Sequence, residues 1–138
     1  MHPMTSPYDD GPRRAGDVVI VNLLNALENR CTSGKRRPAV LIRRENGHWA
    51  TMGLTTNPRY QDGTPRVGIP EPQAVGLRGP GWLWGGRLAN ISVLDIGPRI
   101  GQVDAPMAEA IIALAQLDAD AAAALWVAAG SSESEGDK

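Results

Sequence analysis

Hydrophobic residues form short runs with strand-like spacing over the first two thirds of the chain, and a helical stripe over the last third. Residues 18–23 are few and rich in β-branched side chains, which predicts a strand buried on both faces. Residues 39–42 predict a second strand, and Asn46-Gly47 is typical of a two-residue hairpin turn. We therefore expect residues 49–55 to pair antiparallel with the second strand, with Trp49 in the core.

The signals are weaker between residue 56 and the helical stripe. Turn-forming residues and short apolar runs alternate there, and proline or glycine interrupts most of the runs. In order, the pattern predicts a surface loop (57–65), a short strand (67–69), a Trp-Leu-Trp segment with Trp82 and Trp84 on one face, and one further strand or a turn within residues 88–93 and 96–100.

The helical stripe begins after Asp104, a good N-cap residue, and Pro106 is tolerated in a first helical turn. Residues 119–129 continue the helical pattern, and Gly130 is expected to end it. Short strands followed by helix predict the β+α class, as a small, strongly curved antiparallel β-barrel with a C-terminal helix packed on it. The apolar stripe consists of Met107, Ala108, Ile111, Ile112, Leu114 and Ala115.

The chain has 138 residues, enough for one core. Residues 16–130 are expected to form a single domain, preceded by a flexible lead-in (1–15) and followed by a disordered acidic tail (131–138). No apolar stretch approaches the length of a membrane span, and the N-terminus lacks a secretory pattern, so a cytoplasmic location is expected. The single Cys31 excludes an intrachain disulfide, and one cysteine with two histidines makes no metal cluster, so we expect no cofactor or metal.

Charge is segregated along the chain. Residues 13–99 hold 13 Arg or Lys against six Asp or Glu, whereas residues 100–138 hold seven acids against Lys138. All but one of the cations in the first group are arginine, which can bind phosphate through two parallel hydrogen bonds. A basic body with an acidic C-terminal part is typical of a protein that binds a polyanion.

Four motifs resemble the MazF/PemK family of toxin endoribonucleases, in the same order along residues 16–117. They are the opening strand after Gly16-Asp17, the Gly34-Lys35-Arg36-Arg37-Pro38-Ala39-Val40 segment, Thr55-Thr56 at the end of the third strand, and an amphipathic helix from about Asp104. The resemblance implies a compact SH3-like barrel, a homodimer, metal-independent cleavage of single-stranded RNA, and neutralisation by an antitoxin.

By motif position, Arg37 resembles the family's catalytic arginine and Thr55 its catalytic hydroxyl residue. Attack by a ribose 2′-OH puts negative charge on the phosphate, and a guanidinium with a hydroxyl can stabilise that charge. Stacking surfaces for bases are also needed, although Trp82 and Trp84 are equally well read as core or interface residues. The candidate RNA-binding residues are Lys35, Arg36, Thr56, Arg59, Arg66, Trp82 and Trp84.

One segment departs from the family pattern. Relatives carry an Asp-Gln-hydrophobic-Arg segment before the helix, where this chain has Gly85-Gly86 and, at the arginine position, Ala89. The departure leaves two alternatives open. The first is a catalytically silent barrel that binds nucleic acid or protein, and the second is a toxin of the same barrel type that poisons gyrase.

Overall fold

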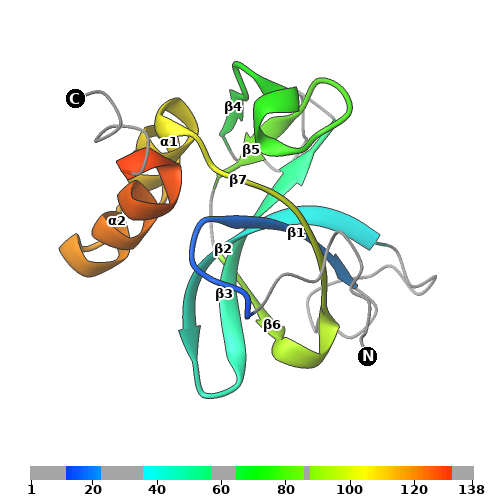
Figure 1. Ribbon diagram of the computed structural model, residues 1–138, viewed down its shortest axis with the longest axis vertical. Helices are drawn as coiled ribbons and strands as arrows, with labels where there is room; N and C mark the ends of the chain where they lie inside the picture. The colour runs from blue at the N-terminus through cyan, green and yellow to red at the C-terminus, as the bar shows by residue number, and fades with distance from the viewer. Residues whose placement is uncertain (1–11, 23–35, 57–64, 86–87, 132–138) are drawn as a thin grey trace.

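The computed structural model describes residues 12–22, 36–56, 65–85 and 88–131 (Figure 1). In these ranges seven strands are followed by two short helices. The strands are β1 (Asp17–Asn22), β2 (Arg36–Glu45), β3 (His48–Thr55), β4 (Arg66–Gly68), β5 (Trp82–Trp84), β6 (Ala89–Ser92) and β7 (Ile96–Gln102), and the helices are α1 (Ala105–Ala115) and α2 (Ala119–Trp126).

The β2–β3 hairpin is the centre of the sheet, and its turn is the predicted one. Asn46 and Gly47 both have positive φ, 54° and 79°, as a two-residue hairpin turn requires. The sheet order is β4-β5-β3-β2-β1-β7, with β6 also paired to β3, and each of these pairings is antiparallel. The β+α class is confirmed. Within the described residues no pairing joins β4 to β7, so the sheet is curved but not closed by hydrogen bonds.

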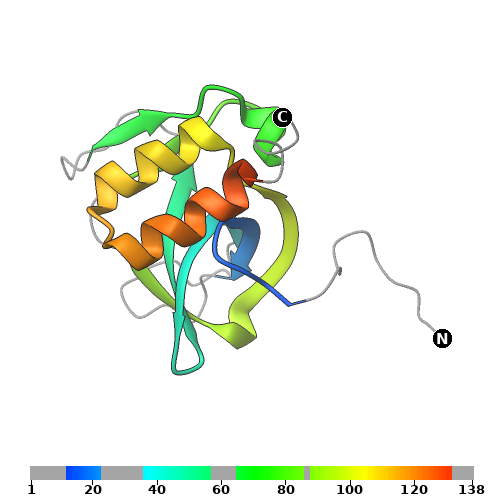
Figure 2. The same cartoon turned by 60° about the vertical axis from the view of Figure 1, so that its left-hand side comes forward.

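Hydrophobic side chains cover both faces of the central strands. On one face, strand residues such as Val40 and Met52 pack against Met107 and Ile111 of α1 and Leu125 of α2, and Figure 2 shows the two helices side by side over that face. The predicted burial of the first strand on both faces is confirmed. The second core lies on the opposite face and consists of Val19, Val21, Ala39, Leu41, Trp49 and Ile91.

The C-terminal part departs from the expected pattern in two places. Residues 88–100 form two strands rather than one, because a 3₁₀ turn at Val93–Asp95 separates β6, which pairs with β3, from β7, which pairs with β1. The helical region is also divided, since Gln116 adopts a left-handed conformation and Asp118 starts a second helix. Gly130, with φ 141°, lies at the end of the helical region as predicted.

The Asp17 carboxylate is fully buried at the start of β1. It accepts hydrogen bonds from the Arg14 backbone N–H (2.8 Å), from Arg99 Nη1 (3.3 Å) and from Gln102 Nε2 (3.1 Å). Arg99 and Gln102 both belong to β7, so one buried side chain fixes β1 against β7. Arg99 is itself largely buried, which makes this an ion pair with little solvent around either charge.

A second aspartate joins α2 to the sheet at the surface. Asp118 caps α2 by accepting from the Ala121 N–H (2.9 Å), and it also accepts from Arg43 Nη2 of β2 at 2.7 Å. The hydrogen bond from Arg43 and the backbone N–H of Ala121 lower the pKa of Asp118 below its ordinary value of 3.8.

We expect Asp17→Ala to be strongly destabilising, because it removes the buried carboxylate that pairs with Arg99 and accepts from Gln102 and the Arg14 N–H. Removing one partner of a buried ion pair typically costs about 3–5 kcal/mol, whereas Asp17→Asn keeps an acceptor and is expected to cost less. Urea unfolding measures both, with Glu109→Ala at an exposed α1 position as the control. Equal stability of Asp17→Ala and the control would contradict the role given to this carboxylate.

We expect the Arg43–Asp118 pair to stabilise the fold above the unfolded-state pKa of Asp118. Its folded-state pKa is depressed, so this contribution is present at neutral pH and is lost as the pH falls through the folded value. Asp118→Asn keeps a capping oxygen but loses the charge, and thermal melts between pH 7 and pH 2 compare it with the wild type. The difference should be small, because both side chains are exposed, and it should vanish at the acid end; a constant difference would refute the assignment.

Candidate functional site

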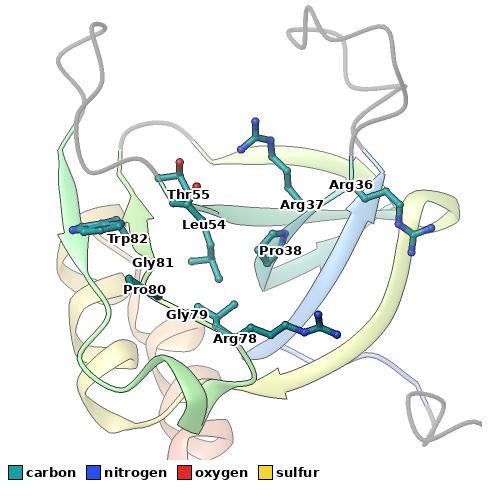
Figure 3. Close-up of a pocket in the computed structure, with 12 residues that line it drawn as sticks. Arg36, Arg37, Pro38, Leu54, Thr55, Arg78, Gly79, Pro80, Gly81 and Trp82 are labelled. Atoms are coloured by element: carbon teal, nitrogen blue, oxygen red, sulfur yellow. The ribbon is translucent and has the colours of Figure 1, made fainter.

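A pocket of about 750 Å³ opens where β2 begins and β3 ends (Figure 3). Its third wall is the loop of residues 77–81, which leads into β5. It is lined by Arg36, Arg37, Pro38, Leu54, Thr55, Thr56, Leu77, Arg78, Gly79, Pro80, Gly81 and Trp82. We call it the arginine pocket.

The arginine pocket opens where the pairing of β2 with β3 stops. The ladder runs from the hairpin turn to Ala39 and Gly53, and the next residue of β2 is Pro38, which has no N–H to donate. Beyond this point β3 pairs on its other edge with β5, through Leu54 with Leu83 and Thr55 with Trp82. The pocket thus lies at the end of the ladder, between the first residues of β2 and the last of β3.

Arg37 and Thr55, the two predicted catalytic residues, both line this pocket. The register of the β2–β3 ladder, continued by two residues, places Arg37 opposite Thr55 on the same face of the sheet. Figure 3 shows the Arg37 side chain and the Thr55 side chain on the same side of their strands. Thr55 is 8% exposed and Arg37 is half-buried, so the protein holds both in place rather than leaving them in free solvent.

Three arginines line the pocket, and the lining residues that the structure describes include no Asp or Glu. Arg36 and Arg37 are consecutive in β2, so their side chains leave the strand on opposite sides, as Figure 3 shows. The third, Arg78, comes from the loop of residues 77–81, and the sequence analysis did not single it out. Its position within a Gly/Pro-rich segment marks it as a loop residue, but no local signal indicates which strands the loop approaches.

Two close backbone contacts position the loop that carries Arg78, one at Gly76 and one at Gly101. It follows the 3₁₀ turn η2 (Pro72–Val75), which packs against β7. A Cβ at Gly76 would overlap the carbonyl of Ile100, and a Cβ at Gly101 would overlap the carbonyl of Val75. Gly76 also has φ 95°, a left-handed conformation that favours glycine. Close approach of the two backbones therefore sets the position of Arg78.

The structure does not bring two other predicted RNA-binding residues to the pocket. Arg66 lies over the ring of Trp84, with its Cζ atom 4.7 Å from the ring centroid, and neither residue lines the arginine pocket. Both belong to the β4–β5 pair, where they face each other across the two strands. Their contact is a cation–π interaction within the fold.

The remaining predictions fall in other parts of the chain. Thr56 and Trp82, also predicted to bind RNA, line the pocket. Several predictions lie outside the described residues: Lys35, Arg59, the lead-in before residue 12, most of the loop at 57–65 and the tail after residue 131.

Two of the departures from the family pattern, Gly85 and Ala89, occupy packed positions, whereas Gly86 lies outside the described residues. The Gly85 N–H donates to the Pro65 carbonyl at 2.9 Å, and a Cβ at Gly85 would approach the Pro65 ring to 2.7 Å. The carbonyl of Ala89 accepts from the Thr51 hydroxyl at 3.1 Å. At these two positions the chain therefore uses backbone groups and small side chains for packing.

No protein-family model matches this sequence, and no curated protein matches it significantly. In the four described ranges, no helix is long and apolar enough to cross a membrane. The same ranges hold no group of three or more His, Cys, Asp or Glu side chains placed to bind a metal ion.

We expect Gly101→Ala to disturb the loop that carries Arg78, because the added methyl group overlaps the Val75 carbonyl. Overpacking of this kind typically costs about 1–3 kcal/mol, and urea unfolding measures the loss. Gly79→Ala is the matched control, since a Cβ there meets no atom within 4 Å. Unfolding free energies that fall equally, or not at all, would show that the glycine contact does not hold the loop.

Proposed function

We propose that the protein is a metal-independent endoribonuclease of the MazF/PemK toxin type, which cleaves single-stranded RNA in the arginine pocket. One observation carries the proposal. Arg37 and Thr55, which the sequence motifs indicate, are 18 positions apart in the chain and line one pocket, where every charged lining residue that the structure describes is an arginine. A concave site with several guanidinium groups suits a phosphodiester.

The reaction follows from these groups. The ribose 2′-oxygen attacks the adjacent phosphorus and loses its proton, and the bond from phosphorus to the 5′-oxygen breaks as that oxygen gains a proton. The products are a 2′,3′-cyclic phosphate and a 5′-hydroxyl end. Negative charge increases on the non-bridging oxygens during attack, and the Arg37 guanidinium is placed to stabilise that charge with its N–H donors. Arg78 supplies a second guanidinium from the opposite wall.

Thr55 and Arg37 have different tasks in this scheme. An arginine gives up its proton only above about pH 12, so Arg37 acts chiefly through charge, with proton donation to the leaving 5′-oxygen as the role implied by the family. The Thr55 hydroxyl can both donate and accept, which suits it to orient the phosphate or the 2′-OH. Both side chains sit at strand ends rather than in long loops, so their geometry is set before the substrate arrives.

Single-stranded RNA is the substrate class that these walls favour. Trp82 lines the pocket beside the arginines, and an aromatic ring next to a cationic groove is the usual arrangement for an unpaired base next to its phosphate. The SH3-like barrel, the homodimer, the cognate antitoxin and the cytoplasmic location belong to the same proposal, on the strength of the family resemblance.

A second candidate function is a catalytically silent barrel that binds RNA. Gly85 and Ala89 favour it, because positions that carry polar side chains in the family pattern are used here for packing. Binding without cleavage would identify this case, and inhibition of DNA supercoiling would instead identify a gyrase poison of the same type.

The decisive test is cleavage of a long single-stranded RNA in EDTA, with protein purified under denaturing conditions and refolded so that no antitoxin remains. We expect discrete fragments with 5′-hydroxyl ends. Arg37→Ala should reduce the cleavage rate by on the order of 10²–10³-fold, as for loss of one transition-state donor. Thr55→Val removes the hydroxyl but keeps the side-chain shape, and it should also slow cleavage.

Arg44→Ala is the matched control, because Arg44 is an exposed arginine of the same strand that does not line the pocket. It should cleave at the wild-type rate. Cleavage that survives Arg37→Ala, or that disappears equally in Arg44→Ala, would contradict the assigned site.

A further inference from the structure

A second pocket, of about 480 Å³, adjoins the arginine pocket and shares one wall with it. The shared wall is formed by residues 78–81 and Trp82, which line both pockets. The other walls of the second pocket come from the end of β4 and from the turn η2, namely Gly68, Ile69, Pro70, Glu71, Pro72 and Gln73. A ligand longer than one chemical group could therefore occupy both pockets at once across the shared wall.

The two pockets differ in charge. Among the described residues, the arginine pocket is lined by three arginines and no acid, whereas the second pocket is lined by Glu71 as well as by Arg78. Glu71 occupies the N-cap position of η2, yet its side chain makes no capping hydrogen bond there. Its carboxylate is exposed and repels phosphate, so the second pocket suits a neutral group that presents N–H donors.

The second pocket also has the apolar surface that a nucleobase requires. Prolines line two of its sides, and the Trp82 indole forms part of the shared wall, with its Nε1 edge next to Gly68, where a Cβ would lie at 3.5 Å. A base that stacks against this wall would have its polar edge near Glu71 and Gln73. A carboxylate accepts hydrogen bonds from an exocyclic amino group, and a side-chain amide can pair with adenine.

We propose that the second pocket is a nucleobase subsite next to the phosphate in the arginine pocket, and that Glu71 makes it select bases with an exocyclic amino group. The inference rests on the proposed function, because it names the base that accompanies the bound phosphate. Cytosine, adenine and guanine offer an amino group to the Glu71 carboxylate. Uracil offers a carbonyl oxygen in place of the cytosine amino group, and that oxygen and the carboxylate repel each other.

Binding of uncleavable RNA tests the subsite apart from catalysis. Short 2′-O-methyl homopolymers of cytosine, adenine and uracil lack the attacking 2′-OH, so fluorescence anisotropy reports binding alone. We expect the wild-type protein to bind the cytosine and adenine strands on the order of tenfold more tightly than the uracil strand. Glu71→Gln should remove most of this difference, because a glutamine amide can donate to the uracil carbonyl.

Four variants separate the subsite from general effects. Glu109→Gln makes the same change of charge on α1, outside both pockets, and should leave the base preference unchanged. Trp82→Leu should weaken binding of all three strands by on the order of tenfold, whereas Trp82→Phe should keep most of the affinity, because stacking needs an aromatic face. Arg37→Ala should weaken all three strands equally.

The outcomes distinguish this inference from the proposed function. Cleavage of RNA together with equal binding of the three strands, or with a preference that Glu71→Gln does not alter, would overturn the base subsite alone. Base-selective binding without cleavage would overturn the catalytic proposal and leave the subsite standing. Failure of the wild-type protein to bind any strand would overturn both.

Discussion

The buried carboxylate of Asp17 is the constraint from which the position of the candidate site follows. A charge without solvent must be paired, and the partners here are Arg99 and Gln102 of β7. Their hydrogen bonds fix the alignment of β7 beside β1, with Gln102 opposite Asp17. The adjoining Gly101 then meets the carbonyl of Val75, and this contact locates the turn before Arg78. The buried Asp17 interaction thus helps to position the wall of the arginine pocket, because it aligns β7, whose residues Ile100 and Gly101 contact the turn before Arg78.

The opposite wall of the pocket depends on a different constraint, the end of the β2–β3 ladder. Pro38 ends the run of residues in β2 that pair with β3, while Leu54 and Thr55 pair with β5 on the other edge of β3. A continuous ladder would bury the space between the strand ends. Because the ladder stops before Arg37 and Thr55, both residues line an open pocket, while Arg37 still pairs with Val21 of β1 and Thr55 with Trp82 of β5.

Local signals account for what could be predicted from the sequence, and long-range contacts account for what could not. The hairpin at Asn46-Gly47 and the cap at Asp104 depend on neighbouring residues, and both form as expected. The left-handed residue between α1 and α2 is Gln116 rather than a glycine, so the sequence does not predict where one helix ends and the next begins. Likewise, no local pattern tells an arginine that lines a pocket, such as Arg78, from one that lies over a tryptophan, as Arg66 does. The motifs were enough to select Arg37 and Thr55 from the sequence, whereas Arg78 could be placed at the pocket only from the fold.

The charge segregation seen along the chain has a structural cause as well as a functional reading. Two of the acids in the C-terminal part, Asp104 and Asp118, cap the two helices, and helix N-termini favour negative charge. Their placement follows from the helices themselves, without a ligand. Helix capping does not explain the three arginines around one pocket, because two of them lie at the start of a strand and the third lies in a loop. Phosphate groups are the same at every nucleotide, so these arginines can supply affinity but not selectivity. Selectivity must come from a neighbouring surface of different chemistry, and the pocket that shares the Trp82 wall and contains Glu71 is such a surface.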